Sequence, residues 1–380
     1  MQNRDRALLL VVGALAGAGA AWLATSSDRR GDNDEAAEAA TTTPDERGDD
    51  LETPSDRRQP RRTRQHTVSE SSSSSSSGSV DAELTTADGQ SLRVHVVGQR
   101  RLTTVVTIED TSEMWVSEHA PRVQVRSPVW APEGMEAAYA LLDGGSSTSL
   151  VRWTPDGYAR IPGTKGASWP TWTSQGLAFA QDKRIKLQRE GGPEVLVAPA
   201  SPAAEQLQPA GLGDRIWFVE DGQIVEVDLL TNERVLHGEG SEPAPGPELA
   251  WIRDGQVFTA EGARSVKAPL VQFLVWLESG GLSWQQMGED WKTDLVVDDV
   301  VIQEEIAPVN RHSQAKDWLA VVSKAQDSLL FIRDDELVEL RLTATSKAHD
   351  PALRHADGRM QVAYGDGNKL VVLDVTEVLD

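Results

Sequence analysis

Histidine and aspartate lie close together at one place near the C-terminal end of this chain. His349 and His355 are the only close pair among seven histidines, and Asp350 and Asp357 accompany them. Imidazole and carboxylate groups are common partners in acid–base catalysis and in metal binding. Because such side chains are equally at home in a solvated loop between strands, we expect loop residues here and no catalytic group.

The other usual signs of catalysis are missing from the sequence. There is no cysteine, no Gly-x-Ser-x-Gly elbow, no His-Glu-x-x-His motif and no phosphate-binding glycine loop after a strand. The acidic turn Asp294–Asp299 is interrupted by valines and lacks calcium-loop spacing. We therefore predict a protein that is not an enzyme, with no catalytic, cofactor-binding or metal-binding residues; the residues that bind a partner stay unassigned.

A motif with Pro, an apolar residue that is usually Trp, and then Gly marks the elements that would position any site. Its copies are Pro128–Gly134, Pro170–Gly176, the shorter Trp251–Gly255 and the looser Pro351–Gly358. Trp130 and Trp172 are 42 residues apart, and Trp251 follows after 79 more, about twice a forty-residue unit. A period of about 40 residues with several strands in each unit is typical of a β-propeller.

Short β-rich runs recur within each unit and are separated by residues that favour turns. An Asp-Gly pair such as Asp221-Gly222 indicates a hairpin, because glycine accepts the positive φ of a tight turn. The clearest predicted strands are 177–180, 184–188, 194–197, 215–220, 223–228, 233–236 and 369–375. We interpret Trp153–Gly157 as a strand with its hairpin turn inside one blade.

The predicted fold is all-β, a β-propeller of about seven four-stranded blades, with six or eight as alternatives. Units start near Ser127, Ser168, Gln206, Pro247, Pro269, Glu305 and His349. The unit 247–268 looks one strand short. Upstream, 91–97, 103–108, 113–117 and 123–126 also look like strands. They form either a further blade or the strand that completes the last blade and closes the ring, which would protect both edges.

Tryptophan, with 12 residues, outnumbers Phe and Tyr together. Trp130, Trp172 and Trp251 occupy the repeated position, where packing between neighbouring blades explains them. Trp284 and Trp291 lie outside that position. They are the better candidates for an exposed contact, including a sugar-binding surface.

The N-terminal part of the chain has a different composition from the repeats. Arg4 and Arg6 precede the uncharged apolar stretch Ala7–Ala24, so residues 1–25 are predicted to be a signal peptide or a signal anchor forming an apolar helix. Residues 26–80, rich in Ser, Arg and acids, are predicted to be a disordered linker. The β-propeller then occupies 81–380.

Charge and cysteine content limit the partners. Residues 81–380 carry 46 Asp and Glu against 27 Lys and Arg. A negative field of this size disfavours nucleic acid and suits a basic protein surface or cations. With no cysteine, neither a bacterial lipid anchor nor a disulfide is available.

The repeats resemble those of TolB-type propellers, in which a Trp-Ser-Pro-Asp-Gly segment precedes a Leu-Ala-Phe-like strand. Trp130–Gly134 is the most similar copy, and Gln175 replaces the acid in the second copy. The resemblance covers about residues 127–380 and includes no counterpart of the α/β domain that precedes the propeller in TolB itself. It implies a WD40-like propeller in a cell-envelope setting.

These observations lead to a functional hypothesis. We expect an envelope-associated, non-enzymatic β-propeller that acts as a protein-interaction scaffold in the periplasm or extracellular space, tethered to the membrane or secreted. The alternative is a ligand-binding or hydrolytic propeller with its site at the mouth of the central channel, built from residues of distant loops.

Overall fold

The computed structural model describes residues 79–85, 91–97, 102–108, 111, 113–143, 147–189, 194–198, 208–264, 268–308, 310–343 and 345–379. Contacts divide the chain between Ser55 and Asp56, and every described strand belongs to the second unit. The predicted signal segment, and the predicted linker up to Gly78, lie outside the described residues. Within the described part, no helix is long and apolar enough to span a bilayer.

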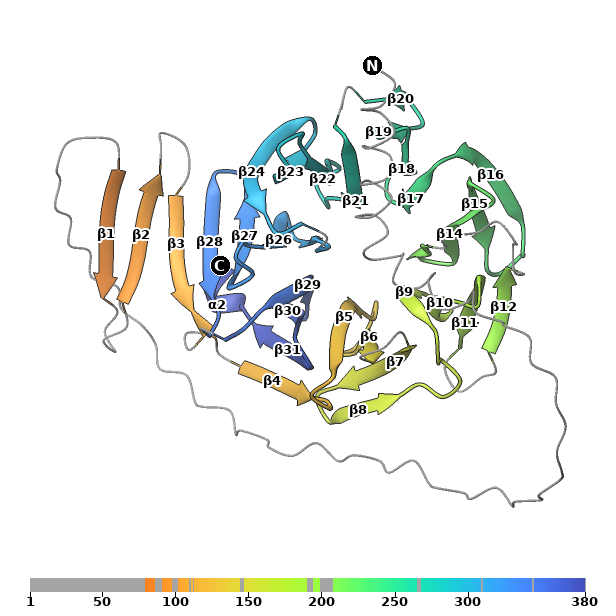
Figure 1. Ribbon diagram of the computed structural model, residues 1–380, viewed down its shortest axis with the longest axis horizontal. Coiled ribbons are helices and arrows are strands. Elements are labelled where there is room, and N and C mark those ends of the chain that lie inside the picture. The colour runs from red at the N-terminus through yellow and green to blue at the C-terminus, as the bar shows by residue number, and fades with distance from the viewer. Residues whose placement is uncertain are drawn as a thin grey trace, which may run out of the picture. The chain divides into compact units, whose positions relative to one another are not determined.

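Seven antiparallel four-stranded sheets, here called blades 1 to 7, follow one another around a ring (Figure 1). Blade 1 contains β5 (Val123–Trp130), β6 (Ala137–Asp143), β7 (Ser147–Thr154) and β8 (Gly157–Arg160). Blade 2 contains β9 (Ser168–Thr173), β10 (Gly176–Gln181), β11 (Arg184–Gln188) and β12 (Glu194–Ala198). Blade 3 contains β13 (Ala210–Leu212), β14 (Arg215–Glu220), β15 (Gln223–Asp228) and β16 (Arg234–Glu239). Blade 4 contains β17 (Ser241–Ala244), β18 (Ala250–Arg253), β19 (Gln256–Thr259) and β20 (Gly262–Ala263).

The remaining blades include strands from both ends of the described chain. Blade 5 contains β21 (Leu270–Trp276), β22 (Leu282–Met287), β23 (Thr293–Val297) and β24 (Val300–Ile306). Blade 6 contains β25 (Ser313–Ala315), β26 (Trp318–Val322), β27 (Ser328–Arg333) and β28 (Glu336–Arg341). Blade 7 contains β29 (Ala348–Ala356), β30 (Arg359–Asp366), β31 (Lys369–Asp374) and β4 (Glu113–Glu118), followed by the short helix α2 (Thr376–Leu379).

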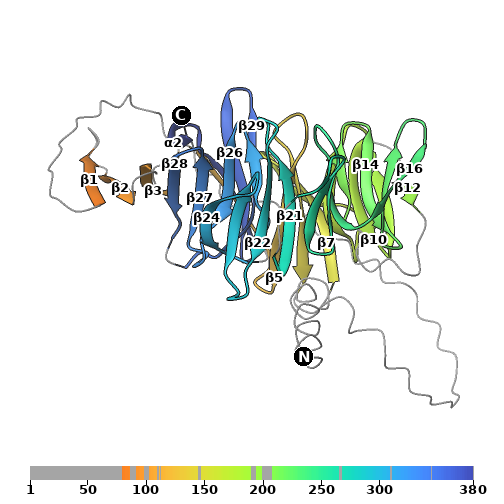
Figure 2. The ribbon, with the colours of Figure 1, turned by 90° about the horizontal axis from the view of Figure 1, so that it is seen from above.

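The ring is closed by strand β4, which comes from the N-terminal side and pairs antiparallel with β31 over six residues. This confirms one of the two arrangements expected from the sequence, in which an upstream strand completes the last blade. Strands β1 (Ser79–Thr85), β2 (Ser91–Val97) and β3 (Leu102–Thr107) do not form a further blade. They extend the outer edge of blade 6, where β3 pairs in parallel with β28 (Figures 1 and 2).

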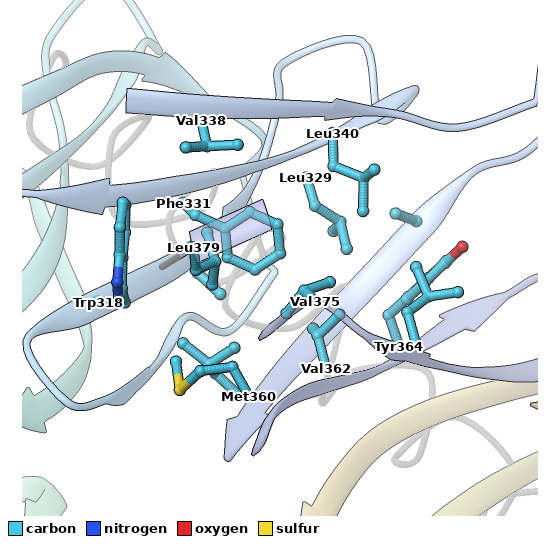
Figure 3. Packing of buried hydrophobic residues seen from close by; sticks show 14 of the residues in the cluster. Trp318, Leu329, Phe331, Val338, Leu340, Met360, Val362, Tyr364, Val375 and Leu379 are labelled. Atoms are coloured by element: carbon cyan, nitrogen blue, oxygen red, sulfur yellow. The ribbon is translucent and has the colours of Figure 1, made fainter. Parts of the chain in front are cut away.

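The first strand of each four-stranded blade lies innermost, and the blades contact one another through these strands. Apolar side chains fill the space between adjacent blades. Between blades 6 and 7, for example, Leu329, Phe331 and Leu340 pack with Val362 and Val375, all at most 1% exposed (Figure 3). Burial of this kind contributes about 1.5–3 kcal/mol for each large side chain, so the interfaces between blades hold the ring together.

The predicted strands agree closely with the observed ones where Asp-Gly turns fix the hairpins, as in β14 and β15. Trp153–Gly157 is indeed the end of β7 and its turn to β8. The predicted unit 247–268 was placed wrongly. Blade 4 starts at Ser241 and has all four strands, each of four residues or fewer. Trp251 lies on its second strand and stacks on Phe258 at 6.1 Å, so it does not share the position of Trp130 and Trp172.

Candidate functional site

A hydrogen bond from an indole defines the true repeat register between blades. Trp130 Nε1 donates to the Ala352 carbonyl oxygen at 2.8 Å, and Trp172 Nε1 donates to that of Val129 at 3.3 Å. Trp276 Nε1, on β21, donates to the Ala244 carbonyl oxygen at 3.0 Å. Each bond runs from the first strand of one blade to the first strand of the preceding blade. Trp276 therefore occupies the place that the sequence analysis gave to Trp251.

Three residues before each of these tryptophans, the innermost strand bulges. Ser127, Trp169 and Phe273 have φ of 47°, 55° and 57°, and the strand register shifts beside each of them. Glu242 and Asp350, both at φ 49°, hold the same place in blades 4 and 7. A left-handed backbone is uncommon outside glycine, above all for aromatic residues, and costs about 1–3 kcal/mol. A bulge that recurs at this cost turns one residue of each strand away from the regular sheet.

Hydrogen bonds place the equivalent residues in the other two blades. The Leu353 N–H donates to Ser313 Oγ at 2.7 Å, and the Gly211 N–H donates to Thr171 Oγ1 at 2.9 Å, in the same relation between neighbouring blades. The equivalent residues are then Arg311 in blade 6 and Gln208 in blade 3. We call the full set the central residues: Ser127, Trp169, Gln208, Glu242, Phe273, Arg311 and Asp350.

Backbone N–H groups of neighbouring blades bind the two acidic central residues. Asp350 accepts from the N–H of Ser127 at 3.1 Å and from the N–H of Arg311 at 3.0 Å, so it joins blades 1, 6 and 7. Glu242 accepts from the N–H of Phe273 in blade 5. Both carboxylates therefore serve as acceptors between blades, a use that leaves them poorly placed as general acids or bases.

Arg311 reaches across the ring. Its guanidinium carbon lies 4.3 Å from the centroid of the Trp169 ring. Trp169 belongs to blade 2, and blades 1 and 7 separate it from blade 6 in one direction while blades 3, 4 and 5 separate it in the other. A contact between such distant blades is possible only at the ring centre. Among the described residues, no hydrogen-bond acceptor or ion-pair partner engages the guanidinium of Arg311, so the indole face is its sole described contact.

Burial shapes the charges at the ring centre. Removal from water raises the pKa of Glu242 to about 7, although the Phe273 N–H and the charge of Arg311 act in the opposite direction. Burial also lowers the pKa of Arg311, an effect that nearby Asp350 and Glu242 oppose. Glu242, Arg311 and Trp169 keep part of their surface accessible to water. The ring centre thus holds a guanidinium that is largely removed from water, near a carboxylate whose pKa is raised to about 7.

The histidine and aspartate group expected from the sequence is not brought together. His349 lies near the start of β29, where its Nδ1 is 3.1 Å from Asn310 Oδ1, whereas His355 lies near the end of this nine-residue strand. Burial and the charge of Arg126 lower the pKa of His349. Both histidines are half-buried on β29, so the expectation of loop histidines in water was wrong, and Asp350 is buried at 6% exposure.

The acidic turn and the two tryptophans outside the repeated position have different outcomes in the structure. Within the described residues, no three His, Asp or Glu side chains are grouped to hold a metal ion. Asp294 and Asp298 instead accept hydrogen bonds from the N–H groups of Glu305 and Leu282. Trp284 is 0% exposed, so its proposed role in an exposed contact was wrong, while Trp291 is 49% exposed.

Trp291 borders a pocket of about 320 Å³ that also includes Lys292, Glu305 and Lys324. Hydrogen bonds from both lysines to Glu305 lower its pKa to about 2. The two ammonium groups therefore already share a carboxylate partner. This pocket offers an aromatic surface, but its lysines already have a carboxylate partner. The ring centre, where a guanidinium has no described acceptor, is therefore the stronger candidate site.

Sequence reasoning missed the central residues, although a signal for them exists. The residue after the central one is proline in five blades: Pro128, Pro170, Pro209, Pro243 and Pro351. Three of these prolines lie in the motif copies recognised from the sequence, whereas Pro209 and Pro243 do not. The residue before each repeated proline is the one that the fold brings to the ring centre.

Comparison with known proteins agrees with this fold. No protein-family model and no curated protein matches the sequence. Among solved structures, a catalytically inactive virginiamycin B lyase from Staphylococcus aureus, bound to quinupristin, matches with a TM-score of 0.50 and 11% identity, over 69% of this chain and 99% of the lyase. The WD40 domain of Pan2 from Neurospora crassa matches with a TM-score of 0.50 and 8% identity, over 70% of this chain and 96% of that domain. The chain is thus a seven-bladed, WD40-like β-propeller.

Proposed function

We propose that this chain is a non-enzymatic β-propeller of the cell envelope that binds a partner protein at its ring centre. The observation that carries the proposal is the contact of Arg311 with Trp169, which leaves a guanidinium facing the ring centre with no acceptor among the described residues. A charged group costs free energy when it is removed from water without a partner. An incoming ligand that supplies an acceptor lowers that cost, and this favours a binding site.

The distribution of exposed apolar side chains supports the ring centre over the rim. Among the residues whose side-chain exposure the structure describes, which leaves out strands β1 and β2, the large exposed apolar side chains are divided among blades 3, 5 and 7, which are not neighbours: Leu212, Leu230, Val235 and Leu236; Trp291, Val300 and Val301; Met114 and Val116. No two of these groups lie on adjacent blades, so they do not merge into the broad apolar patch typical of a large flat interface. Partner recognition at a few polar residues fits this surface better.

A hydrolytic site at the ring centre is less well supported than a binding site. The carboxylates of Asp350 and Glu242 accept hydrogen bonds from backbone N–H groups of neighbouring blades. A general base must instead reach the substrate or its attacking water. The arrangement of the two carboxylates is therefore more compatible with binding of a partner than with catalysis.

The envelope location is part of the proposal and is supported by the sequence alone. Arg4, Arg6 and the apolar stretch Ala7–Ala24 have the order of a signal peptide or signal anchor. TolB-type kinship is likewise part of the proposal, supported by Trp130–Gly134. Cell fractionation of the full-length protein and of a variant lacking residues 7–24 tests the location, because loss of the segment should move the protein out of the envelope fraction.

In-cell crosslinking of the tagged full-length protein, followed by mass spectrometry, tests partner binding. Arg311→Gln and Trp169→Ala should each remove recurrent partners from the captured set. Arg333→Gln is the matched control, because Arg333 also stacks on a tryptophan at 4.3 Å but is ion-paired with Glu336 and lies away from the ring centre. Capture that is unchanged in Arg311→Gln and Trp169→Ala, with both variants folded, would contradict recognition at the ring centre.

A further inference from the structure

The guanidinium of Arg311 contacts an indole ring, and its N–H donors have no acceptor among the described residues. Its guanidinium carbon lies over the Trp169 ring, 4.3 Å from the centroid, as in a cation–π contact. The N–H donors of a guanidinium lie in its plane and point away from a stacked ring. No acceptor among the described residues takes the N–H donors of Arg311, so they keep their hydrogen-bonding capacity toward a ligand.

The neighbouring carboxylates do not satisfy these donors. Asp350 binds the backbone N–H groups of Ser127 and Arg311 itself, and Glu242 binds the N–H of Phe273. Both carboxylates act on Arg311 through their charge, but neither forms an ion pair with it among the described contacts. The guanidinium of Arg311 thus contacts the Trp169 ring and lies near two carboxylates that already accept backbone hydrogen bonds.

We propose that the guanidinium N–H donors of Arg311 bind a carboxylate group of the partner protein. A planar carboxylate accepts two parallel N–H bonds from the planar fork of a guanidinium. This inference rests on the proposed function and names the chemical group that the same site takes.

Charge argues for a carboxylate over a phosphate. The ring centre already holds Asp350 and Glu242 near Arg311, so a group with nearly two negative charges meets about twice the repulsion that a carboxylate meets. The pKa of Glu242, raised to about 7 by burial, reduces that repulsion for a single negative charge. The excess of 46 acids over 27 bases in residues 81–380 further disfavours a polyanion. It favours a basic partner that presents one carboxylate at the contact, at its C-terminus or on an acidic side chain.

Titration of the full-length protein with small probes tests the inference. The probes are acetyl-Gly-Gly with a free C-terminal carboxylate, its C-terminal amide, N-acetyl-aspartic acid amide and inorganic phosphate, followed by the tryptophan indole N–H signals in NMR spectra. We expect at least one carboxylate probe to bind saturably and at least tenfold more tightly than the amide. The C-terminal and side-chain probes distinguish the two sources of the carboxylate. Phosphate that binds more tightly than both would overturn the proposed class.

Variants connect the binding to Arg311. Arg311→Gln should weaken the carboxylate probe at least tenfold, and Arg311→Lys, which keeps the charge but loses the planar fork, should give an intermediate loss. Arg333→Gln should bind like the parent protein. Equal binding by Arg311→Gln and the parent, or no saturable carboxylate binding by the parent, refutes the inference. If crosslinked partners still depend on Arg311 while no carboxylate probe binds, the proposed function stands and only the assigned chemical group is wrong.

Discussion

The indole hydrogen bonds between blades make a quantitative prediction about stability. Trp276 is 9% exposed, and its Nε1 donates to the Ala244 carbonyl oxygen at 3.0 Å. The ring also packs tightly on blade 4, since a Cβ added to Gly246 would fall 2.2 Å from Trp276 Cδ1. In Trp276→Phe the aromatic ring is retained, but the N–H is lost and the carbonyl of Ala244 loses that donor.

Two contributions set the expected loss of unfolding free energy for Trp276→Phe. A buried carbonyl left without its donor costs about 1–3 kcal/mol. The smaller ring buries less apolar area, which costs about 1 kcal/mol at about 25 cal/mol per Å². We therefore expect a loss of about 2–4 kcal/mol, a large share of the roughly 5–15 kcal/mol that stabilises a typical folded protein.

Urea unfolding at pH 7, followed by far-UV circular dichroism, measures this loss. Trp291→Phe is the control, because Trp291 is 49% exposed and makes no described bond between blades; it should change stability by about 0.5 kcal/mol or less. Replacement of Trp276 by benzothienylalanine, in which sulfur takes the place of the N–H, separates the hydrogen bond from the ring size. If Trp276→Phe and Trp291→Phe lose the same stability, the indole bonds do not hold the blades together and the repeat register argued here is wrong.

Three further predictions follow from other contacts. Gly211→Ala should cost at least about 2 kcal/mol in urea unfolding, because a Cβ there would lie 2.3 Å from the Trp172 carbonyl oxygen, whereas Gly213→Ala, with open space around it, should cost only about 1 kcal/mol of backbone strain; equal losses would contradict the steric argument. For Glu242 the folded pKa of about 7 lies above the ordinary 4.5, so the folded protein holds the extra proton and stability should fall as pH rises from about 4.5 to about 7. Glu242→Gln should remove up to about 3 kcal/mol of this pH dependence, and superimposable stability–pH curves would argue against it. Deletion of residues 1–121, which removes β4, should abolish cooperative unfolding by exposing the edge of β31, while deletion of residues 1–111 should preserve it.

Local sequence predicted the strands because local chemistry specifies them. In β14 and β15, runs rich in apolar residues flank Asp221-Gly222, and the turn fixes the register of the pair. The same reasoning misplaced blade 4. Trp251 followed by Asp254-Gly255 looks like the repeated motif, but a tryptophan before a hairpin turn fits any strand of a blade. What distinguishes Trp276 from Trp251 is the indole hydrogen bond of Trp276 to the preceding blade, and that bond depends on tertiary structure.

The candidate site could not be predicted from local sequence for a related reason. Arg311 and Trp169 are 142 positions apart in the chain, and nothing near either residue indicates the other. The seven-fold arrangement brings them together by placing one residue of each blade at the ring centre. The alternative expected from the sequence likewise drew its site from residues of distant loops.

The repeats themselves indicate which position is free to carry specificity. Proline directly follows the central residue in five of seven blades. Tryptophan occurs three residues after the central residue in three blades. The tryptophans recur where an indole hydrogen bond joins neighbouring blades. The central position, in contrast, holds seven different residue types: Ser, Trp, Gln, Glu, Phe, Arg and Asp. The blade fold does not fix the residue type at this position, and every blade places it at the ring centre. The residue there can therefore change without loss of the fold. In the proposed function, the ring centre is therefore where this propeller contacts its partner, and Arg311 is the residue whose hydrogen bonds that partner completes.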